Sequence, residues 1–384
     1  MRNSNRKRIR LLDIFRGIAI LGTLGTNIWI FAHLGDLSYI FTFHHYEWWN
    51  SFDHFIRILS LSLINGKLLG LLSIMFGIGL ELKYQQSLRK GNPWPGVYLW
   101  TAFFLLIEGF LHFTFVMEYD ILMGYAVTAM IVAFIVKASE KFIKRSMVLI
   151  GSIHLLFILI VFLGVLTQNV SGNFAGGMQE ITVLYQNETW LDQIQYRISN
   201  FLSLRGEAIF TIPFNVFLFL TGVLLMRKGA FADDKKGRYI RSKMLKIGLC
   251  VGLPLNLLLF VPGGLFDFPV RYLFAPILSI GYMGLISFMV DKKKSLRLWG
   301  LLEKVGTMSL SCYVMQNILC SIIFYGWGLG VGPLKSSLLT LLLWGFVSVV
   351  QILFVVLWLN FHKLGPMEAG RRFMTRRVIP TNSK

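Results

Sequence analysis

Charged residues are scarce in this chain, and acidic residues are scarcer than basic ones. Asp, Glu, Lys and Arg make up 15% of the 384 residues, whereas roughly 25% is usual for a soluble domain. Hydrophobic residues make up 55%, and the mean hydropathy is +0.62. The composition therefore excludes an ordinary soluble domain and is typical of a protein that crosses the membrane several times.

Cysteine is also scarce, since only Cys250, Cys312 and Cys320 are present and all three lie in apolar runs. An odd set of this kind gives no disulfide framework. We find no Cys or His spacing typical of zinc, and we expect neither a metal nor a bound cofactor. We also find no RNA-binding motif, so no nucleic-acid partner is expected despite a formal net charge of +19. The first apolar run lacks a small-residue cleavage site and is interpreted as a retained span.

Apolar runs of about 20 residues are abundant instead. They predict an all-α integral membrane protein with about ten transmembrane helices embedded in a lipid bilayer. Their approximate limits are 14–34, 58–81, 98–117, 120–137, 147–167, 207–226, 246–263, 268–290, 306–327 and 336–359.

The basic residues alternate between the loops. Of the 38 Lys and Arg residues, all but seven lie before the first span, in every second loop or in the tail. This pattern predicts a multi-pass protein of the cell membrane with both termini in the cytoplasm. The largest loop on the other side is 168–206, and we expect it to connect two five-helix halves, 1–167 and 207–384. Its stretch 188–198 has near-helical spacing and predicts either a short surface helix or a solvated connector.

A few polar side chains lie inside the predicted spans. In the first span, Arg16, Thr23 and Asn27 share one helical face. Polar groups are costly in hydrocarbon unless they face a bundle interior or a water-filled cavity. We therefore expect this face to line a site. The other polar candidates are Lys67, Glu108, His112, Asp120, Arg271, Tyr313, Gln316 and Asn317, most of them in the outer half of the membrane.

Glu108 and His112 are one helical turn apart. A carboxylate beside an imidazole orients the ring and raises its basicity, so this pair is a catalytic candidate. Glu108 is expected to pair with a cation, either Lys67 or Arg271. Other interpretations remain open: a structural ion pair, a histidine in helix packing, or cations that extend to the outer interface. Tyr313, Gln316 and Asn317 would either join helices by hydrogen bonds or hold a polar substrate.

Five segments, in order along the chain, resemble the YeiB-type family of bacterial polytopic membrane proteins, which carry a C-terminal domain of unknown function. They are 12–19 with Asn27, Gly66-Lys67 with 72–77, 119–122, 306–316 and 361–368. The tail differs at 369–372, where the family tends to have a tryptophan-rich continuation.

The first span is also similar, more distantly, to the opening helix of transmembrane acyltransferases. That resemblance implies transfer of an acyl group from cytosolic acyl-CoA to a small-molecule, glycan or lipid-linked acceptor across the membrane. In the branch that modifies surface glycans, an arginine is followed after ten residues by a histidine, and here Asn27 stands in that place after Arg16. In the lysosomal branch, an asparagine stands there and the active histidine lies outside the first helix. Its counterpart would be His33, His44 or His45, or else His112, which we favour because Glu108 is beside it.

We therefore predict a membrane acyltransferase-like protein with His112 and Glu108 as catalytic residues. The substrate-binding candidates are Arg16, Asn27, Lys67, Asp120, Arg271, Tyr313, Gln316 and Asn317. The alternatives are a transporter or flippase and a non-catalytic scaffold or immunity-type membrane protein. The sequence does not give the oligomeric state.

Overall fold

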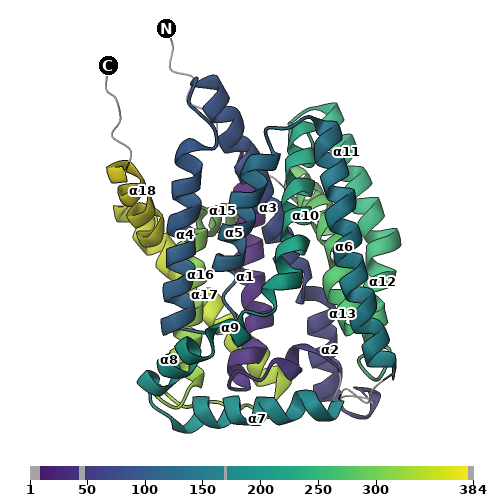
Figure 1. Ribbon diagram of the computed structural model, residues 1–384, viewed down its shortest axis with the longest axis vertical. Helices are drawn as coiled ribbons and strands as arrows, with labels where there is room; N and C mark the ends of the chain where they lie inside the picture. Colours follow the sequence, from purple (N-terminus) through teal and green to yellow (C-terminus); the bar gives the residue numbers. More distant parts are fainter. Residues whose placement is uncertain (1–8, 43–47, 168–170, 294, 379–384) are drawn as a thin grey trace.

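The chain is described here by a computed structural model that covers residues 9–42, 48–167, 171–293 and 295–378. All regular elements in these residues are helical (Figure 1). The long and medium helices are α1 (Arg10–Ala32), α2 (Phe52–Ile64), α3 (Lys67–Arg89), α4 (Gly96–Phe115), α5 (Leu122–Ile135), α6 (Glu140–Thr167), α7 (Ser171–Asn187), α8 (Trp190–Ser199), α10 (Ala208–Arg227), α11 (Lys235–Ile247), α14 (Ala275–Lys292), α15 (Arg297–Thr307), α16 (Ser309–Phe324), α17 (Ser337–Phe361) and α18 (Pro366–Val378). The short ones are η1 (Leu37–Ile40), η2 (Trp48–Asn50), α9 (Phe201–Leu204), η3 (Gly248–Gly252), α12 (Leu253–Leu257), η4 (Leu258–Phe260), α13 (Asp267–Pro269) and η5 (Val270–Phe274).

The helical content confirms the predicted all-α membrane protein. In the described part of the chain, eight helical segments are long and apolar enough to cross a bilayer, and α15 with α16 makes a ninth if this pair, bent by 87°, is one span. The remaining predicted span, 120–137, corresponds to α5, which is apolar but shorter, at 14 residues. Each of the ten apolar runs therefore falls on helical structure, although some runs are divided between several helices.

The predicted span 58–81 is broken in the structure. Helix α2 ends before Asn65, and α3 begins after Gly66, whose φ is +78°. A Cβ at Gly66 would lie 2.8 Å from the Arg271 carbonyl oxygen and 3.0 Å from the Ala275 Cβ. A left-handed residue at a close approach favours glycine, and it separates one continuous apolar run into two helices.

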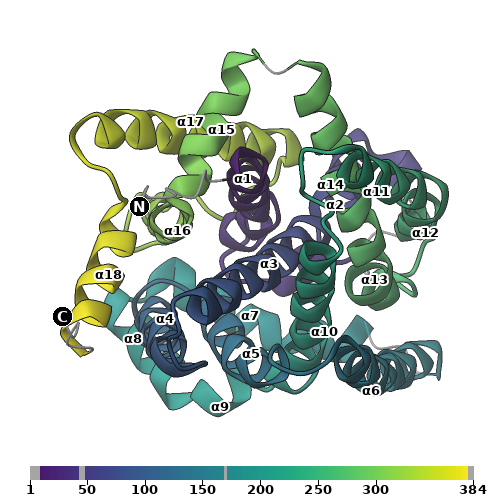
Figure 2. The same ribbon diagram turned by 90° about the horizontal axis from the view of Figure 1, so that it is seen from above.

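Helix α1 lies in the middle of the bundle, with α3, α14, α15, α16 and α17 around it (Figure 2). Its close crossing with α15 depends on two glycines. A Cβ on Gly17 would meet the Leu302 carbonyl oxygen at 2.0 Å, and one on Gly306 would meet the Asp13 carbonyl oxygen at 1.8 Å. The absence of side chains lets the two backbones touch, so that α1, from the first part of the sequence, is enclosed by helices from the last part.

Helix α7 lies across one end of the bundle, and both chain termini lie at the other end (Figure 1). We call these the α7 end and the termini end. The predicted helix near 188–198 is confirmed as α8, which begins with a capping box between Thr189 and Asp192. The connector 168–206 is thus largely helical in its described residues.

Candidate functional site

A chain of four buried polar side chains joins three parts of the fold. His112 comes from α4, Asp120 from the α4–α5 turn, Asn317 from α16 and Asn27 from α1. His112 Nδ1 lies 3.0 Å from Asp120 Oδ1, and Asn317 Nδ2 lies 3.1 Å from His112 Nε2. Asn27 Nδ2 donates to Asn317 Oδ1 at 3.4 Å. The structure therefore brings four of the predicted site residues together, and we call them the polar chain.

When the His112 imidazole is neutral, the donors and acceptors along the polar chain can be assigned in one consistent way. A carboxylate only accepts hydrogen bonds, so the proton of His112 belongs on Nδ1, which faces Asp120. Nε2 then accepts from the Asn317 amide, whose oxygen accepts in turn from Asn27. Asp120 is held by the Met123 backbone N–H at 2.9 Å. The hydrogen bond from Asn317 therefore favours the tautomer that carries its proton on Nδ1, with Asp120 Oδ1 3.0 Å from that atom.

The carboxylate beside His112 is Asp120, not Glu108. Glu108 pairs with Arg371 of α18, whose Nε lies 3.0 Å from Glu108 Oε2 and whose Nη2 also contacts that oxygen. The predicted pairing of Glu108 with Lys67 or Arg271 is therefore wrong. The sequence could not indicate Arg371, because it lies in a basic tail that we assigned to topology alone.

Tyr313 and Gln316 both belong to α16, but their side chains contact different partners. The Tyr313 ring lies 5.1 Å from the His112 ring, and its hydroxyl accepts from the Ile121 backbone N–H at 3.4 Å. Gln316 faces α17 instead, where its side-chain oxygen accepts from Gln351 Nε2 at 3.3 Å. Tyr313 thus belongs to the surroundings of His112, and Gln316 joins two helices.

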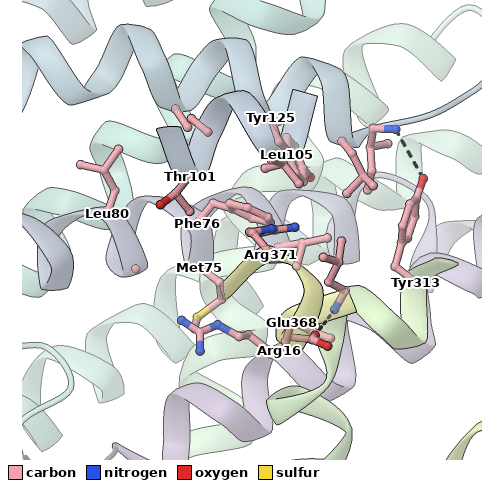
Figure 3. A pocket seen from close by; sticks show the side chains of 18 of the residues that line it. Arg16, Met75, Phe76, Leu80, Thr101, Leu105, Tyr125, Tyr313, Glu368 and Arg371 are labelled. Atoms are coloured by element: carbon pink, nitrogen blue, oxygen red, sulfur yellow. Dashed lines mark hydrogen bonds between the residues drawn. The ribbon is translucent and has the colours of Figure 1, made fainter. Parts of the chain in front are cut away.

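A cavity of about 210 Å³ lies on the termini-end side of the polar chain (Figure 3). Three cations line it: Arg16 of α1, Lys83 of α3 and Arg371 of α18. Figure 3 shows Arg16 and Arg371 among apolar side chains that include Phe76 and Leu105. We call this cavity the basic chamber. It combines apolar walls with positive charge, which is the chemistry that an anionic amphiphile requires.

Helix α18 forms part of the chamber wall through two contacts. Glu368 accepts hydrogen bonds from the backbone N–H groups of Leu310 at 2.9 Å and Ser311 at 3.3 Å, at the N-terminus of α16. Arg371 holds the other side of α18 to α4 through Glu108. Glu368, Lys83 and Arg371 were not among the predicted site residues, although the segment 361–368 carries part of the family resemblance.

A second cavity, of about 130 Å³, lies on the α7 side of the polar chain. Asn27, Asp120 and Arg271 line it, together with Arg205 and Glu207. We call it the α7-side cavity. Both cavities are lined by Ile121 and Tyr125. The two spaces therefore meet at these two residues, next to the polar chain.

Arg271 lines the α7-side cavity, whereas Lys67, the first residue of α3, is not among the residues that line it. Lys67 is 0% exposed, so its ammonium group does not extend to the outer interface. Arg271 Nη1 donates to the Asn65 side-chain oxygen. In the described residues, Nζ of Lys67 has no hydrogen-bond partner.

The other histidine candidates lie away from the polar chain or outside the described residues. His33 caps the end of α1, where its Nδ1 donates to the Trp29 carbonyl oxygen at 2.9 Å. His44 and His45 lie outside the described residues. Across the described ranges, no three His, Cys, Asp or Glu side chains are grouped in a way that could hold a metal ion.

Comparisons with known proteins agree with the predicted family. Residues 225–377 match the family described as "Protein of unknown function (DUF418)". The chain is 28% identical to "Uncharacterized protein YeiB" of Escherichia coli, over 97% of this chain and 98% of that protein. It is 26% identical to "Uncharacterized protein YxaH" of Bacillus subtilis, over 94% of this chain and 92% of that one.

The chain is therefore similar to YeiB and YxaH along nearly its whole length. A third relative, "Uncharacterized 39.9 kDa protein in amylase 3'region" of Bacillus acidopullulyticus, is 25% identical over 96% of this chain and 94% of its own length. No solved structure matches the chain. The DUF418 region begins at the end of α10 and includes α16 and α18, which supply Asn317 and Arg371. The remaining members of the polar chain come from the part before it.

Proposed function

We propose that this YeiB-like protein transfers an acyl group across the membrane, from a cytosolic acyl-CoA thioester to an acceptor in the α7-side cavity. The observation that carries the proposal is the pair of cavities that meet at Ile121 and Tyr125, beside a histidine oriented by a carboxylate. A donor and an acceptor that enter from opposite ends would meet only there.

The basic chamber suits the donor. Arg16, Lys83 and Arg371 would bind the phosphate groups of the coenzyme, and apolar side chains such as Phe76 and Leu105 would pack against the acyl chain. The termini end faces the cytosol in this proposal, in agreement with the basic loops.

His112 acts as the general base. A hydroxyl group of the acceptor gives its proton to His112 Nε2 while its oxygen attacks the thioester carbonyl carbon. The carbon–sulfur bond breaks, and the thiolate takes the proton back from the imidazolium, which leaves an ester and free coenzyme thiol. Asp120 stabilises the imidazolium, and the amide of Asn27 donates to the developing oxyanion. Asn317 must first release Nε2, since it donates to this atom.

The test measures free thiol released from acetyl-CoA and palmitoyl-CoA by the purified protein in proteoliposomes. The variant His112→Ala is expected to lower thioester cleavage by about 100-fold or more. His112→Gln serves if the alanine variant does not fold. The matched control is His154→Ala, because His154 is another buried histidine within a span, bound to the Tyr272 carbonyl oxygen at 3.1 Å. The control should retain the wild-type rate within about threefold. Equal rates in the two variants, or no cleavage by the wild type, would overturn the proposal.

One observation favours a transporter instead. His112 lines neither cavity, and its Nε2 already accepts a hydrogen bond. In that case Ile121 and Tyr125 would form a barrier between two vestibules, and the charged side chains would bind a substrate during alternating access. Counterflow of a labelled substrate in proteoliposomes, without thioester cleavage, would support the transporter.

A further inference from the structure

The segment between α4 and α5 places Asp120 beside His112, although residues 116–121 form no regular structure. In the described part of the chain, no backbone N–H donates to the carbonyl oxygen of Glu118 or of Asp120. Both residues are 1% exposed, and a buried carbonyl group without a donor costs free energy. The conformation of this segment therefore depends on donors from other parts of the fold.

Arg205 supplies these donors from the residue that follows α9, 85 positions after Asp120 in the sequence. Its Nη1 donates to the Glu118 carbonyl oxygen at 3.1 Å, and its Nη2 donates to the Asp120 carbonyl oxygen at 3.0 Å. A guanidinium group is a planar, rigid fork of donors. It therefore holds the backbone on both sides of Tyr119 in one relative position.

Arg205 also contacts the end of α4. Its guanidinium carbon lies 5.8 Å from the centre of the Phe113 ring, which is fully buried and directly follows His112 in the sequence. Nη1 lies 3.4 Å from Glu207 Oε1, which supplies a counter-charge to the partly buried cation. Arg205 therefore touches the chain between His112 and Asp120 at three residues.

The neighbouring helices of the connector contact the same part of the chain. The Trp190 indole N–H, at the start of α8, donates to the Phe115 carbonyl oxygen at 2.9 Å. The Tyr185 hydroxyl, on α7, donates to the Glu118 carboxylate. Among these contacts, the two hydrogen bonds of Arg205 lie nearest to Asp120.

We propose that Arg205 is a positioning residue, which holds residues 113–120 in the conformation that places Asp120 Oδ1 3.0 Å from His112 Nδ1. It acts on the imidazole through Asp120 and not by contact with the ring. The inference deepens the proposed function, on which the role of Arg205 in acyl transfer rests. Its effect on the surroundings of His112 does not depend on that function.

The first test measures kcat and KM for thioester cleavage of palmitoyl-CoA by Arg205→Lys in proteoliposomes. Lysine keeps the charge but has a single ammonium group in place of the planar fork. We expect kcat to fall at least about tenfold, because Asp120 no longer keeps its place beside His112. KM for palmitoyl-CoA should stay within about threefold of the wild-type value, because Arg205 does not line the basic chamber.

The matched control is Arg227→Lys, at the other end of α10. Arg227 is also partly buried, pairs with Glu81 at 3.1 Å and donates to the Val136 carbonyl oxygen at 2.6 Å. It lines neither the basic chamber nor the α7-side cavity. The control variant should therefore keep both kcat and KM.

The second test does not depend on turnover. Protein labelled with nitrogen-15 histidine gives an Nδ1 signal for His112, which is assigned by its loss in His112→Gln. The same signal in Asp120→Asn marks the position expected when no carboxylate lies beside Nδ1. Arg205→Lys should move the His112 signal toward that position, whereas Arg227→Lys should leave it unchanged.

An unchanged His112 signal in Arg205→Lys would overturn the positioning role, and so would an unchanged kcat beside an active wild type. An equal loss of kcat in Arg227→Lys would overturn it as well. If Arg205→Lys does not fold, Arg205→Gln is measured in its place, because its amide still donates to one carbonyl group. A shifted signal without thioester cleavage by the wild type would preserve the positioning of Asp120 and overturn the acyl transfer.

Discussion

His33, at the α7 end, is a single residue whose protonation state affects the stability of the fold. Its ring stacks on Tyr39, and Nδ1 donates to the Trp29 carbonyl oxygen. The pKa of His33 is lowered from 6.5 to about 4, mainly by burial and partly by the nearby Arg57, against the opposing effects of the Trp29 carbonyl and Asp53. The folded protein therefore favours the neutral ring, and protonation favours the unfolded state.

We expect the free energy of unfolding to fall by up to about 3 kcal/mol as the pH is lowered from 7 to 4. The stability that neutral His33 contributes is fully present above pH 6.5 and is lost as the pH approaches 4. Unfolding followed by tryptophan fluorescence should show a weaker pH dependence in His33→Gln, whose amide still donates to Trp29. His362→Gln, at an exposed position, is the control and should behave as the wild type does. Identical pH profiles for the wild type and His33→Gln would contradict the assignment.

The site residues show what a sequence can and cannot reveal at this scale. His112, Asp120, Asn27 and Asn317 were all recognisable, because a polar side chain within an apolar run stands out. The pairing of these residues could not be predicted, since His112 and Asn317 are 205 residues apart in the sequence. Periodicity favoured Glu108 as the partner one turn away, but the turn after α4 brings Asp120 back to the ring.

At the scale of elements, apolar runs predict helices well and their interruptions poorly. The break between α2 and α3 is not visible in the hydropathy pattern. The chain changes direction at Asn65 and Gly66 alone, and these two residues lie within a continuous apolar run. The 87° bend between α15 and α16 falls at Met308, which is itself apolar, so hydropathy does not mark this bend either. Both breaks matter for the site, because α3 begins at the α7-side cavity and α16 begins at the contact with Glu368.

Helix α18 should depend on the ion pair between Glu108 and Arg371. Arg371→Ala leaves the half-buried Glu108 carboxylate without its cation, and we expect a loss of about 2–4 kcal/mol in stability. The double variant Glu108→Gln with Arg371→Ala removes both charges and should regain at least half of that loss. Thermal unfolding checks the stabilities, and limited proteolysis of the tail reports whether α18 has detached. A double variant no more stable than Arg371→Ala would show that the pair does not hold α18.

At the scale of the whole molecule, the function of the two cavities depends on which side of the membrane each one faces. The fold separates two ends, with α7 across one and both termini at the other (Figure 1). Helix α11, which carries one of the basic clusters, lies at the termini end. By the positive-inside rule we expect this end to face the cytoplasm, where the basic chamber could receive a cytosolic anion.

Cysteine labelling of intact cells tests this orientation. The background is Cys250→Ser, because Cys250 is the exposed native thiol among the described residues, whereas Cys312 and Cys320 are buried. Asn92→Cys places an exposed thiol in the loop between α3 and α4, and Glu188→Cys places one between α7 and α8. A membrane-impermeant maleimide should label Glu188→Cys in intact cells and Asn92→Cys only after the membrane is opened. The reverse pattern would place the α7-side cavity toward the cytoplasm, and the basic chamber would then be unable to bind a cytosolic donor.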